Sequence, residues 1–364
     1  MIYFDNAATT PPLPFSQDEN AFFGNPSSPH GLGRRAERAL NSARTEIAGI
    51  LGCRENEIIF TSGGTESNNL AIIGFAQAYK RQSPKIYAQP WEHPSILEAV
   101  RFAKEQGLAE TQISSSLEIE SSGITLVSLS QVSHETGDIN DITELAAAIK
   151  KQNPEAIIHV DGVQGFCKEP TKLTNIDLYS FSGHKIHGAA GVGGLVVRSG
   201  IRLTPLLHGG NQEFSLRAGT ENLAGILQTT TAAKILYDTR EKNYTHAAAI
   251  KAELSTLTEI LPDCHLNART NTVSPYILNL SFDGIKGETL VHLLSEKGIY
   301  VSMGAACRSR KKTTSILETM GFTPERAQSA VRFSSSHLNT IEEAAKVKEI
   351  IVSSVEQMRR VLKR

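Results

Sequence analysis

Short β-rich runs alternate with helical patterns from about residue 45 to residue 235 of this chain. This alternation is typical of a mostly parallel sheet that is covered by helices. The predicted strands are the runs EIIF ending at Phe60, KIYAQ at Gln89, TLVSLSQV at Val132, AIIHV at Val160, DLYSF at Phe181 and VGGLVV at Val197. The sequence therefore predicts a large α/β domain with a mostly parallel sheet.

A second, smaller domain is predicted after this region. A long helical pattern over 222–260 leads to a strand (YILNLSF), a helix (GETLVHLLSEKG) and two more strands (IYVSM and AVRFS). The last predicted helix begins with a capping box, Thr340 and Glu343, and has an apolar stripe at helical spacing: Val347, Ile350, Ile351, Val355, Met358 and Leu362. Since 364 residues exceed what one core usually accommodates, we expect a large domain over 15–255 and a small α+β domain formed by 1–14 plus 256–364.

Charge and cysteine content exclude several classes of protein. Lys and Arg total 37 against 38 Asp and Glu, so no general attraction to nucleic acid or to an anionic membrane is expected. The N-terminal segment MIYFDNAATTPP resembles no signal peptide, and no stretch is apolar enough to span a bilayer. Cys53, Cys167, Cys264 and Cys307 form no C-x-x-C pair. A reduced cytoplasmic protein with free thiols is expected, although the sequence alone leaves a disulfide open.

Glycines and polar residues follow five of the predicted strands. The segments are TSGGTESNN after Phe60, PWEH after Gln89, SHETG after Val132, DGVQ after Val160 and SGHK after Phe181. In open parallel sheets, ligands bind beyond the carboxyl ends of the strands. Because the five segments converge on that edge, the sequence predicts a binding site there.

Each of these segments also has a structural interpretation. TSGGTES could be a strand-to-helix turn capped by Thr65 or Ser62, rather than a phosphate cradle at a helix N-terminus. Asp161 could be another cap, and His93 a polar residue under a loop. The two histidines that flank Lys185 suggest zinc only weakly, because no cysteine or third histidine lies at metal-ligand spacing, and we expect no metal.

Lys185 is the least ordinary residue of this set. A structural lysine usually lies on a solvated helix face, whereas Lys185 follows a buried strand and is surrounded by small residues. A partly desolvated lysine reacts as a neutral amine near neutral pH. A phosphate cradle, a lysine for a Schiff base and a carboxylate for a pyridinium nitrogen, here Asp161, are what pyridoxal 5′-phosphate requires, and His93 is in a position to stack on its ring.

The motifs that carry these residues resemble those of a known family. YFDNAATTP, FGNPSS, FTSGGTESNNLAI, EH, VDGVQ, SFSGHKIHG, LRAGTEN, GAAC and VRFS occur in the order seen in cysteine desulfurases, which belong to the class V branch of fold-type I pyridoxal-phosphate enzymes. The resemblance extends from Tyr3 nearly to the C-terminus. It implies a fold-type I transferase, whose large domain has a mostly parallel sheet of the seven-stranded type, and a homodimer with shared active sites.

The resemblance also implies roles for individual residues. Lys185 holds the cofactor, Asp161 pairs with the pyridine nitrogen, Gln164 bonds the ring hydroxyl, and His93 stacks on the ring and acts as acid and base. The phosphate is held by Gly64, Thr65, Ser182 and His184, with Thr220 reaching it from the other subunit. Arg332 clamps the substrate carboxylate with its bidentate fork.

Cys307 distinguishes a desulfurase from an aminotransferase within this branch. It lies in the stretch MGAACRSRKKTT, where small residues suit a mobile loop and the cations that follow favour the thiolate. An incidental cysteine in a basic surface loop is the structural alternative, which we reject because of the position within the motif. The long gap between Cys307 and the LETMG segment resembles the mobile-loop subgroup.

Three residues depart from the family pattern: His134 in place of asparagine beside the cofactor, Gly162 in place of alanine, and Trp91 in place of a small residue. We expect a cytoplasmic cysteine desulfurase that acts on L-cysteine and passes sulfur from Cys307 to an acceptor protein. A class V aminotransferase or selenocysteine lyase is the first alternative, and a catalytically disabled sulfur-pathway partner is the second.

Overall fold

The chain forms two compact units in the computed structural model, which describes residues 1–14, 23–116, 118–303 and 315–362. The large unit comprises Pro11–Gln131 and Asn140–Asp238, and the small unit comprises Met1–Thr10, Val132–Ile139 and Thr239–Arg364. These bounds differ from the expected domains in three places. Residues 11–14 belong to the large unit, whereas Val132–Ile139 and helix α7 (Arg240–Ser255) belong to the small unit.

The large unit is built on a seven-stranded sheet with the strand order β2-β8-β7-β6-β5-β3-β4. Its strands are β2 (Ile58–Thr61), β3 (Lys85–Ala88), β4 (Glu110–Ile113), β5 (Thr125–Ser130), β6 (Ile157–Asp161), β7 (Leu178–Ser182) and β8 (Gly193–Val197). Only β8 pairs antiparallel with its neighbours, so the prediction of a mostly parallel sheet is confirmed. The sequence patterns did not indicate β4, an edge strand with mostly exposed side chains.

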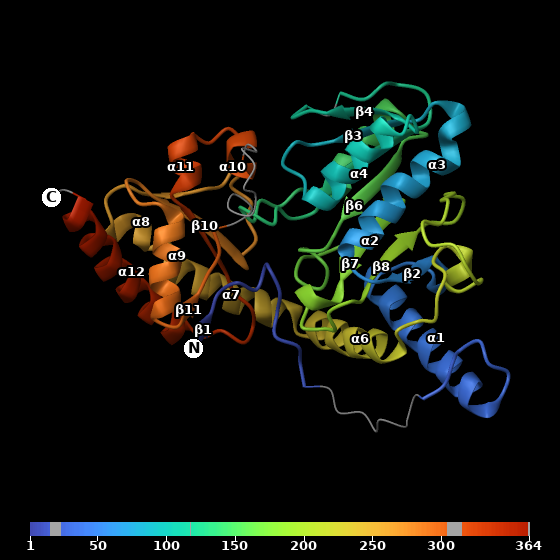
Figure 1. Ribbon diagram of the computed structural model, residues 1–364, viewed down its shortest axis with the longest axis horizontal. Coiled ribbons are helices and arrows are strands. Elements are labelled where there is room, and N and C mark those ends of the chain that lie inside the picture. Colours follow the sequence, from blue (N-terminus) through green and yellow to red (C-terminus); the bar gives the residue numbers. More distant parts are fainter. Residues whose placement is uncertain (15–22, 117, 304–314, 363–364) are drawn as a thin grey trace. The chain divides into compact units, whose positions relative to one another are not determined.

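Helices cover both faces of this sheet (Figure 1). The first face packs against α1 (Gly31–Leu51), α5 (Ile142–Gln152) and α6 (Leu223–Asp238). The second face packs against α4 (Pro94–Glu105) and a continuous helical run made of α2 (Gly64–Asn69), a π-helical turn (Leu70–Gly74) and α3 (Phe75–Tyr79). Because side chains alternate along a strand, every strand of this sheet except the edge strand β4 contributes to both cores.

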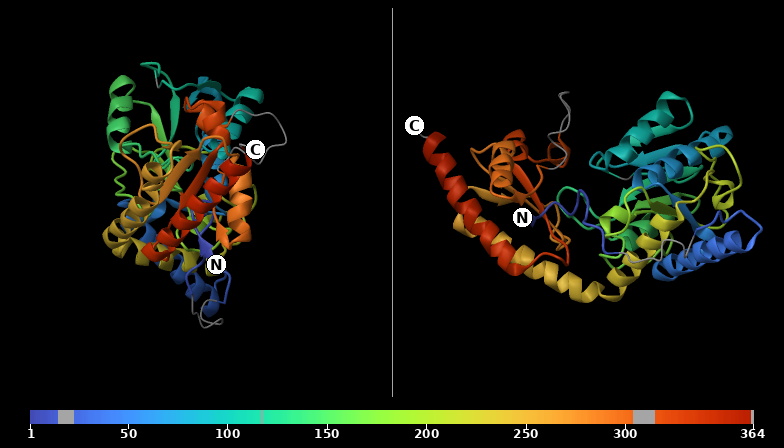
Figure 2. Two further views of the ribbon diagram at one scale, coloured as in Figure 1. Left: turned by 90° about the vertical axis from the view of Figure 1, so that its left-hand side faces the viewer. Right: turned by 60° about the horizontal axis from the view of Figure 1, so that its bottom comes forward.

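The small unit combines a three-stranded antiparallel sheet with long helices. Its strands are β9 (Cys264–Leu266), β10 (Ile277–Phe282) and β12 (Ala330–Ser334), and β1 (Ile2–Tyr3) pairs in parallel with β11 (Ile299–Tyr300). Its helices are α7, α8 (Leu257–Ile260), α9 (Gly287–Glu296), α10 (Ile316–Thr319), α11 (Pro324–Gln328) and α12 (Ile341–Leu362). Helices α7 and α12 lie side by side (Figure 2).

Two predictions about helices can be compared with this structure. The helical pattern over 222–260 corresponds to α6, α7 and α8, which are separated at Thr239 and Thr256. The predicted capping box of α12 is present, since Thr340 N–H donates to Glu343 Oε2 and Glu343 N–H donates to Thr340 Oγ1. Among the helices of the described residues, none is long and apolar enough to cross a membrane.

Candidate active site

One face of the large sheet changes from apolar to polar toward the carboxyl ends of its central strands. On the face that packs against α2 and α4, the strands β5, β6 and β7 begin with Leu126, Ile157 and Leu178. The side chains that follow on this face are all polar: Ser128, Ser130, His159, Asp161, Ser180 and Ser182. The opposite face of the same strands stays apolar. The strand register aligns Ser130, Asp161 and Ser180 in one row across the sheet.

His159 forms the floor beneath this row. It is fully buried, and its ring nitrogens contact Ser128 Oγ at 2.8 Å and Ser180 Oγ at 2.9 Å. Burial lowers the pKa of His159 to about 4. The ring is therefore neutral at physiological pH, and its two hydrogen bonds to serines satisfy both nitrogens.

Asp161 ends β6 with its carboxylate held by two donors. Its Oδ1 accepts from Val163 N–H at 3.0 Å, and its Oδ2 accepts from Asn68 Nδ2 at 2.7 Å. The side chain is buried next to the polar row. A carboxylate held in this way is a fixed acceptor that can serve a ligand N–H group.

Lys185, His93 and His184 lie close enough to affect one another's charge. Burial lowers the pKa of His93, and the charge of Lys185 lowers it further, against the opposing effect of Asp161. Burial likewise lowers the pKa of His184 to about 4, with contributions from Lys185 and Lys168. The predicted cofactor lysine, the predicted acid–base histidine and the predicted carboxylate therefore converge at one edge of the large sheet.

A tight turn presents Lys185 at this edge. The strand β7 ends at Ser182 and continues directly into a short 3-10 helix, Gly183–Lys185. A Cβ atom at Gly183 would lie 2.5 Å from Oγ1 of Thr229 in α6, so only glycine allows the helix to approach the turn this closely. Thr229 also accepts from Ala189 N–H at 3.2 Å. Packing of the turn against α6 therefore requires glycine at position 183, two residues before Lys185.

The predicted phosphate loop lies beside Ser182. Helix α2 is capped by Gly63, at φ 149°, without a side-chain hydrogen bond, so neither Ser62 nor Thr65 is the N-cap. Ser62 N–H instead donates to Glu66 Oε2, whose other oxygen accepts from Arg217 Nε. Ser182 Oγ is buried and has no hydrogen-bond partner among the described residues. An unsatisfied hydroxyl beside a glycine turn fits an anion that binds there.

The segment that leads to Thr220 is anchored by a buried ion pair. Three consecutive residues, Glu213, Phe214 and Ser215, have positive φ angles of 46°, 56° and 64°. Glu213 binds the Arg44 guanidinium at 2.8 Å and accepts from Phe60 N–H. Strained backbone of this kind persists only where the surroundings impose it. Arg44 therefore holds the start of the segment in place, while Thr220 itself is exposed.

Gln164 is buried and receives a hydrogen bond from a lysine to which the sequence patterns assigned no role. Its Oε1 accepts from Lys168 Nζ at 3.2 Å. Burial lowers the pKa of Lys168 to about 8. The spacing of four residues between Gln164 and Lys168 in a turn-rich segment is the only sequence signal for this pair.

The structure gives a reason for glycine at position 162 that the sequence did not reveal. A Cβ atom at this position would lie 1.9 Å from Cζ of Tyr179 in the neighbouring strand β7. Tyr179 is fully buried, and its hydroxyl donates to Gln131 Oε1 at 2.8 Å. The tyrosine ring therefore excludes alanine at position 162. The third departure, Trp91, is buried and donates through Nε1 to Gln89 Oε1 at 3.2 Å.

The small unit carries the predicted substrate arginine. Arg332 in β12 is buried, and it donates through Nη1 to the His134 carbonyl at 2.6 Å and through Nη2 to Asp5 Oδ1 at 3.1 Å. Its Nε is buried without a hydrogen-bond partner within the described part of the chain. The structure thus brings His134 and Arg332 together in one unit, whereas the other predicted cofactor residues belong to the large unit. Cys307 lies outside the described residues.

The other cysteines and the second flanking histidine have structural surroundings. Among the residues that the structure describes, Cys53, Cys167 and Cys264 form no disulfide. Burial raises the pKa of Cys53 to about 11 and that of Cys264 to about 12, so neither is a thiolate at neutral pH. His187 Nδ1 contacts the Pro11 carbonyl oxygen at 2.7 Å and must donate, since a carbonyl only accepts.

Three further polar residues of the site were not indicated by the sequence patterns. Asn68 contacts Asp161, and Ser95 contacts both Asn68 and His93. Glu92 is fully buried and accepts a hydrogen bond from Ser130 N–H. Burial raises the pKa of Glu92 to about 8, with a smaller contribution from the charge of Asp161. Asn68 and Glu92 lie inside the family motifs, but no pattern in the sequence indicates what they touch.

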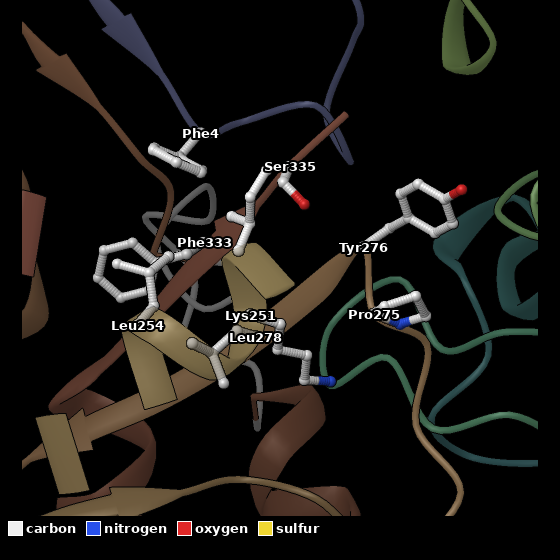
Figure 3. Close-up of a pocket in the computed structure, with 9 residues that line it drawn as sticks. Phe4, Lys251, Leu254, Pro275, Tyr276, Leu278, Phe333 and Ser335 are labelled. Carbon is white, nitrogen blue, oxygen red and sulfur yellow. The ribbon is translucent and has the colours of Figure 1, made fainter. Parts of the chain in front are cut away.

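A small pocket in the small unit is unrelated to this site. It is a cavity of about 10 Å³ lined mostly by apolar side chains of α7, β10 and β12, among them Leu254, Leu278 and Phe333 (Figure 3). Lys251 lines it as well and donates to the Ser274 carbonyl. A space of this size holds about one water molecule and no cofactor.

Comparison with known proteins yields close matches over nearly the whole chain. Residues 2–347 match the family Aminotransferase class-V. A NifS/IcsS protein homolog of Lactobacillus delbrueckii is 38% identical over 94% of both chains, and the cysteine desulfurase IscS of Methanosarcina thermophila is 35% identical over 98% of this chain and 93% of its own. The solved structure of a NifS-like protein has a TM-score of 0.85 and 32% identity, covering 99% of both chains. A structure of SspA in complex with cysteine has a TM-score of 0.76 and 27% identity, covering 92% of this chain and 98% of its own.

Proposed function

The chain belongs to the aminotransferase class-V family, and on that basis we propose that it is a cysteine desulfurase, which converts L-cysteine to L-alanine and keeps the sulfur as a persulfide on Cys307. Relatives that match it nearly end to end carry the name cysteine desulfurase. The observation that carries the proposal is the convergence of Lys185, His93 and Asp161 at the carboxyl edge of the sheet.

The residues of this edge fit pyridoxal 5′-phosphate. Ser182 Oγ is a buried hydroxyl that needs a partner, and a phosphate oxygen satisfies it. Asp161 is a buried acceptor for the pyridine N–H group, and Lys185 is a half-buried amine for covalent attachment. When bound, the cofactor supplies an electron sink that stabilises negative charge on the substrate.

The remaining cofactor contacts are assigned to residues around the same edge. Gln164, which lies within hydrogen-bond distance of Lys168, bonds the ring hydroxyl. His93 lies over the ring and moves protons. Ser182 shares the phosphate with Gly64, Thr65 and His184 of the same chain and with Thr220 of a second copy. The enzyme is accordingly a homodimer in which each active site uses both chains.

Substrate recognition is assigned to the small unit. Arg332 binds the carboxylate of L-cysteine, and its two anchors, Asp5 and the His134 carbonyl, fix the plane of the guanidinium. A planar fork with a fixed orientation suits two-point binding of a carboxylate. The anchor on residue 134 is its main-chain carbonyl, so it does not depend on the identity of the side chain at this position.

Cys307 supplies the nucleophile for sulfur transfer. Its thiolate attacks the substrate sulfur, a sulfur–sulfur bond forms, and the bond between that sulfur and the substrate Cβ breaks. The electron pair of the broken bond stays with Cβ, which takes up a proton and becomes the methyl group of alanine. Cys307 retains the persulfide until an acceptor protein removes the outer sulfur. The product serves iron–sulfur cluster or thio-cofactor synthesis, and the enzyme acts in the cytoplasm.

The decisive experiment measures sulfide and alanine release from L-cysteine in the presence of a thiol reductant. The wild type is expected to release both in equal amounts, and Cys307→Ser is expected to bind the cofactor but release neither. Trapping with an alkylating reagent should locate the persulfide on Cys307. A persulfide on Cys53, Cys167 or Cys264 would contradict the assignment of the nucleophile.

The same assay separates the alternatives. A class V aminotransferase or a selenocysteine lyase forms no persulfide on Cys307 when it is given L-cysteine. A disabled sulfur-pathway partner shows neither a visible cofactor absorbance nor a spectral response to L-cysteine.

A further inference from the structure

A line of hydrogen bonds connects Asp161 to His93 through two side chains with no predicted role. Asn68 Nδ2 donates to Asp161 Oδ2 at 2.7 Å and to Ser95 Oγ at 2.8 Å. Ser95 Oγ lies 2.8 Å from His93 Nδ1, and the Ser95 backbone N–H donates to the same nitrogen at 3.1 Å. All four residues belong to the large unit.

The direction of every hydrogen bond in this line follows from its ends. An ionised carboxylate only accepts, so Asn68 must turn its NH₂ group toward Asp161. The second N–H of that group donates to Ser95 Oγ. The Ser95 hydroxyl can therefore donate its own proton to His93. At the other end, a backbone N–H only donates, so Nδ1 of His93 must be unprotonated. A neutral ring with an unprotonated Nδ1 carries its proton on Nε2.

The orientation of Asn68 leaves its own carbonyl oxygen without a hydrogen-bond partner among the described residues, which also indicates that the NH₂ group is the part that matters. Asn68 is 1% exposed, and its Oδ1 is buried without a hydrogen-bond partner among the residues that the structure describes. A buried unsatisfied carbonyl destabilises a fold, and an apolar side chain of similar size avoids this penalty. The amide is therefore better explained by the two partners of its nitrogen than by stability.

The charged groups around His93 agree with a neutral ring. Burial has the largest effect and lowers the pKa of His93; Asp161 raises it and Lys185 lowers it. The ring also caps α4 as an acceptor, through the Ser95 N–H group, and a proton on Nδ1 would repel that N–H group. Protonation of His93 would thus disrupt the first turn of the helix.

We propose that Asn68 is a positioning residue of the site, which holds Asp161 and Ser95 with its two N–H groups and, through Ser95, keeps His93 as the neutral tautomer protonated on Nε2. His93 then presents an N–H donor on its Nε2 side. The use of that proton in acid–base chemistry depends on the proposed function, whereas the tautomer and the hydrogen-bond directions do not.

The tautomer is tested by nitrogen NMR of the full-length protein labelled with ¹⁵N-histidine, without added substrate. His93→Gln identifies the resonances of His93 by their disappearance. We expect an unprotonated Nδ1 and a protonated Nε2 from pH 7 to pH 9. A protonated Nδ1 in this range, in either the neutral or the charged ring, overturns the proposal.

Variants of the serine test how the hydroxyl contributes. Ser95→Ala removes one of the two donors to Nδ1, so the pKa of His93 should rise, and Ser95→Thr, which keeps a hydroxyl, should restore it. Asn69→Ala is the matched control for position 68, because the neighbouring Asn69 side chain donates to the Thr65 and Ser95 carbonyls and not to the line itself. A His93 titration that is identical in Ser95→Ala and in the wild type contradicts the role of Ser95.

Cofactor affinity tests Asn68 itself, by equilibrium dialysis against pyridoxal 5′-phosphate. Asn68→Ala removes one hydrogen bond to the Asp161 carboxylate and should weaken binding about tenfold. Asn68→Asp, which keeps the shape but not the donors, should weaken it at least as much, and Asn69→Ala should stay within about twofold of the wild type. Unchanged affinity in both Asn68 variants overturns the proposal. If the wild type itself fails to bind the cofactor, the proposed function fails, and the NMR result still decides the tautomer.

Discussion

At the scale of single residues, the site depends on side chains whose surroundings change their ordinary chemistry. Burial and neighbouring charge keep His93 and His184 neutral, and burial brings the pKa of Lys168 to about 8. Of the two lysines Lys168 and Lys185, only Lys185 lies directly after β7, in the short 3-10 helix Gly183–Lys185.

Lys185→Ala is expected to abolish turnover and the visible absorbance of the purified protein. Lys168 cannot replace Lys185, because its amine is bound to Gln164 Oε1. Absorbance spectra and the rate of alanine formation measure both effects. Lys168→Ala is the control and should keep the visible absorbance; a coloured, active Lys185→Ala protein would contradict the assignment of the cofactor lysine.

His134→Asn is expected to keep activity but to flatten the pH dependence below neutral pH. Arg332 contacts the carbonyl of residue 134, which asparagine retains, so the anchor of the arginine survives. An imidazole titrates near neutral pH and an amide does not, so the titration should disappear. The measurement is kcat/KM against pH for both proteins. Superimposable profiles would place the His134 side chain outside the active site.

At the scale of secondary-structure elements, close packing decides the residues that surround the site. Helix α6 lies against the turn of Lys185 through Thr229, and β7 lies against the end of β6 through Tyr179. At Gly162 and Gly183, a neighbouring element occupies the space that a Cβ atom would need, so packing explains why these positions are glycine. They do not mark space for a ligand.

Gly162→Ala is expected to destabilise the protein by about 1–3 kcal/mol, the usual cost of overpacking a core. The added Cβ would lie 1.9 Å from Tyr179 Cζ, and the tyrosine is fixed by its hydrogen bond to Gln131. Denaturant unfolding measures the change. Gly49→Ala in α1 is the control, since its Cβ meets nothing within 4 Å, and it should stabilise the helix by about 0.5–1 kcal/mol. Equal stabilities of the two variants would show that Tyr179 can move aside.

At the scale of the whole molecule, Glu92 couples the buried site to the stability of the fold. Burial raises its pKa to about 8 from an ordinary value of 4.5, so the folded protein binds a proton that the unfolded chain releases between these values. Glu92 therefore contributes most below pH 4.5, and its contribution falls as the pH rises toward 8.

Glu92→Gln should remove this dependence, because the amide has no proton to lose. Between about pH 5 and pH 8, the free energy of unfolding of the wild type is expected to fall relative to the variant by up to about 1.4 kcal/mol per pH unit. Glu98→Gln, a change at an exposed ion pair, serves as the control and should follow the wild type. A constant difference between Glu92→Gln and the wild type across this range would mean that Glu92 is ionised in the folded protein.

Local patterns in the sequence determined the sheet, most of its strands and the residues at the strand ends. Strand runs such as those ending at Val160 and Phe181 are recognisable because alternation and β-branched residues depend only on near neighbours in the chain. The parallel arrangement follows from the intervening helices, and it alone places Asp161 and Lys185 at one edge of the sheet. The edge strand β4 was missed because its side chains are mostly exposed.

Only the tertiary structure decided what those residues touch. Asn68 in α2 contacts both Ser95 in α4 and Asp161, which lies 93 positions beyond Asn68 in the chain. Tyr179 excludes a side chain at Gly162 from a neighbouring strand, and Arg332 finds its anchors at the opposite end of the sequence, in Asp5, and in the segment after β5. These contacts join residues far apart in the chain, and hydrogen-bond direction, burial and pKa depend on distances that local sequence patterns do not contain.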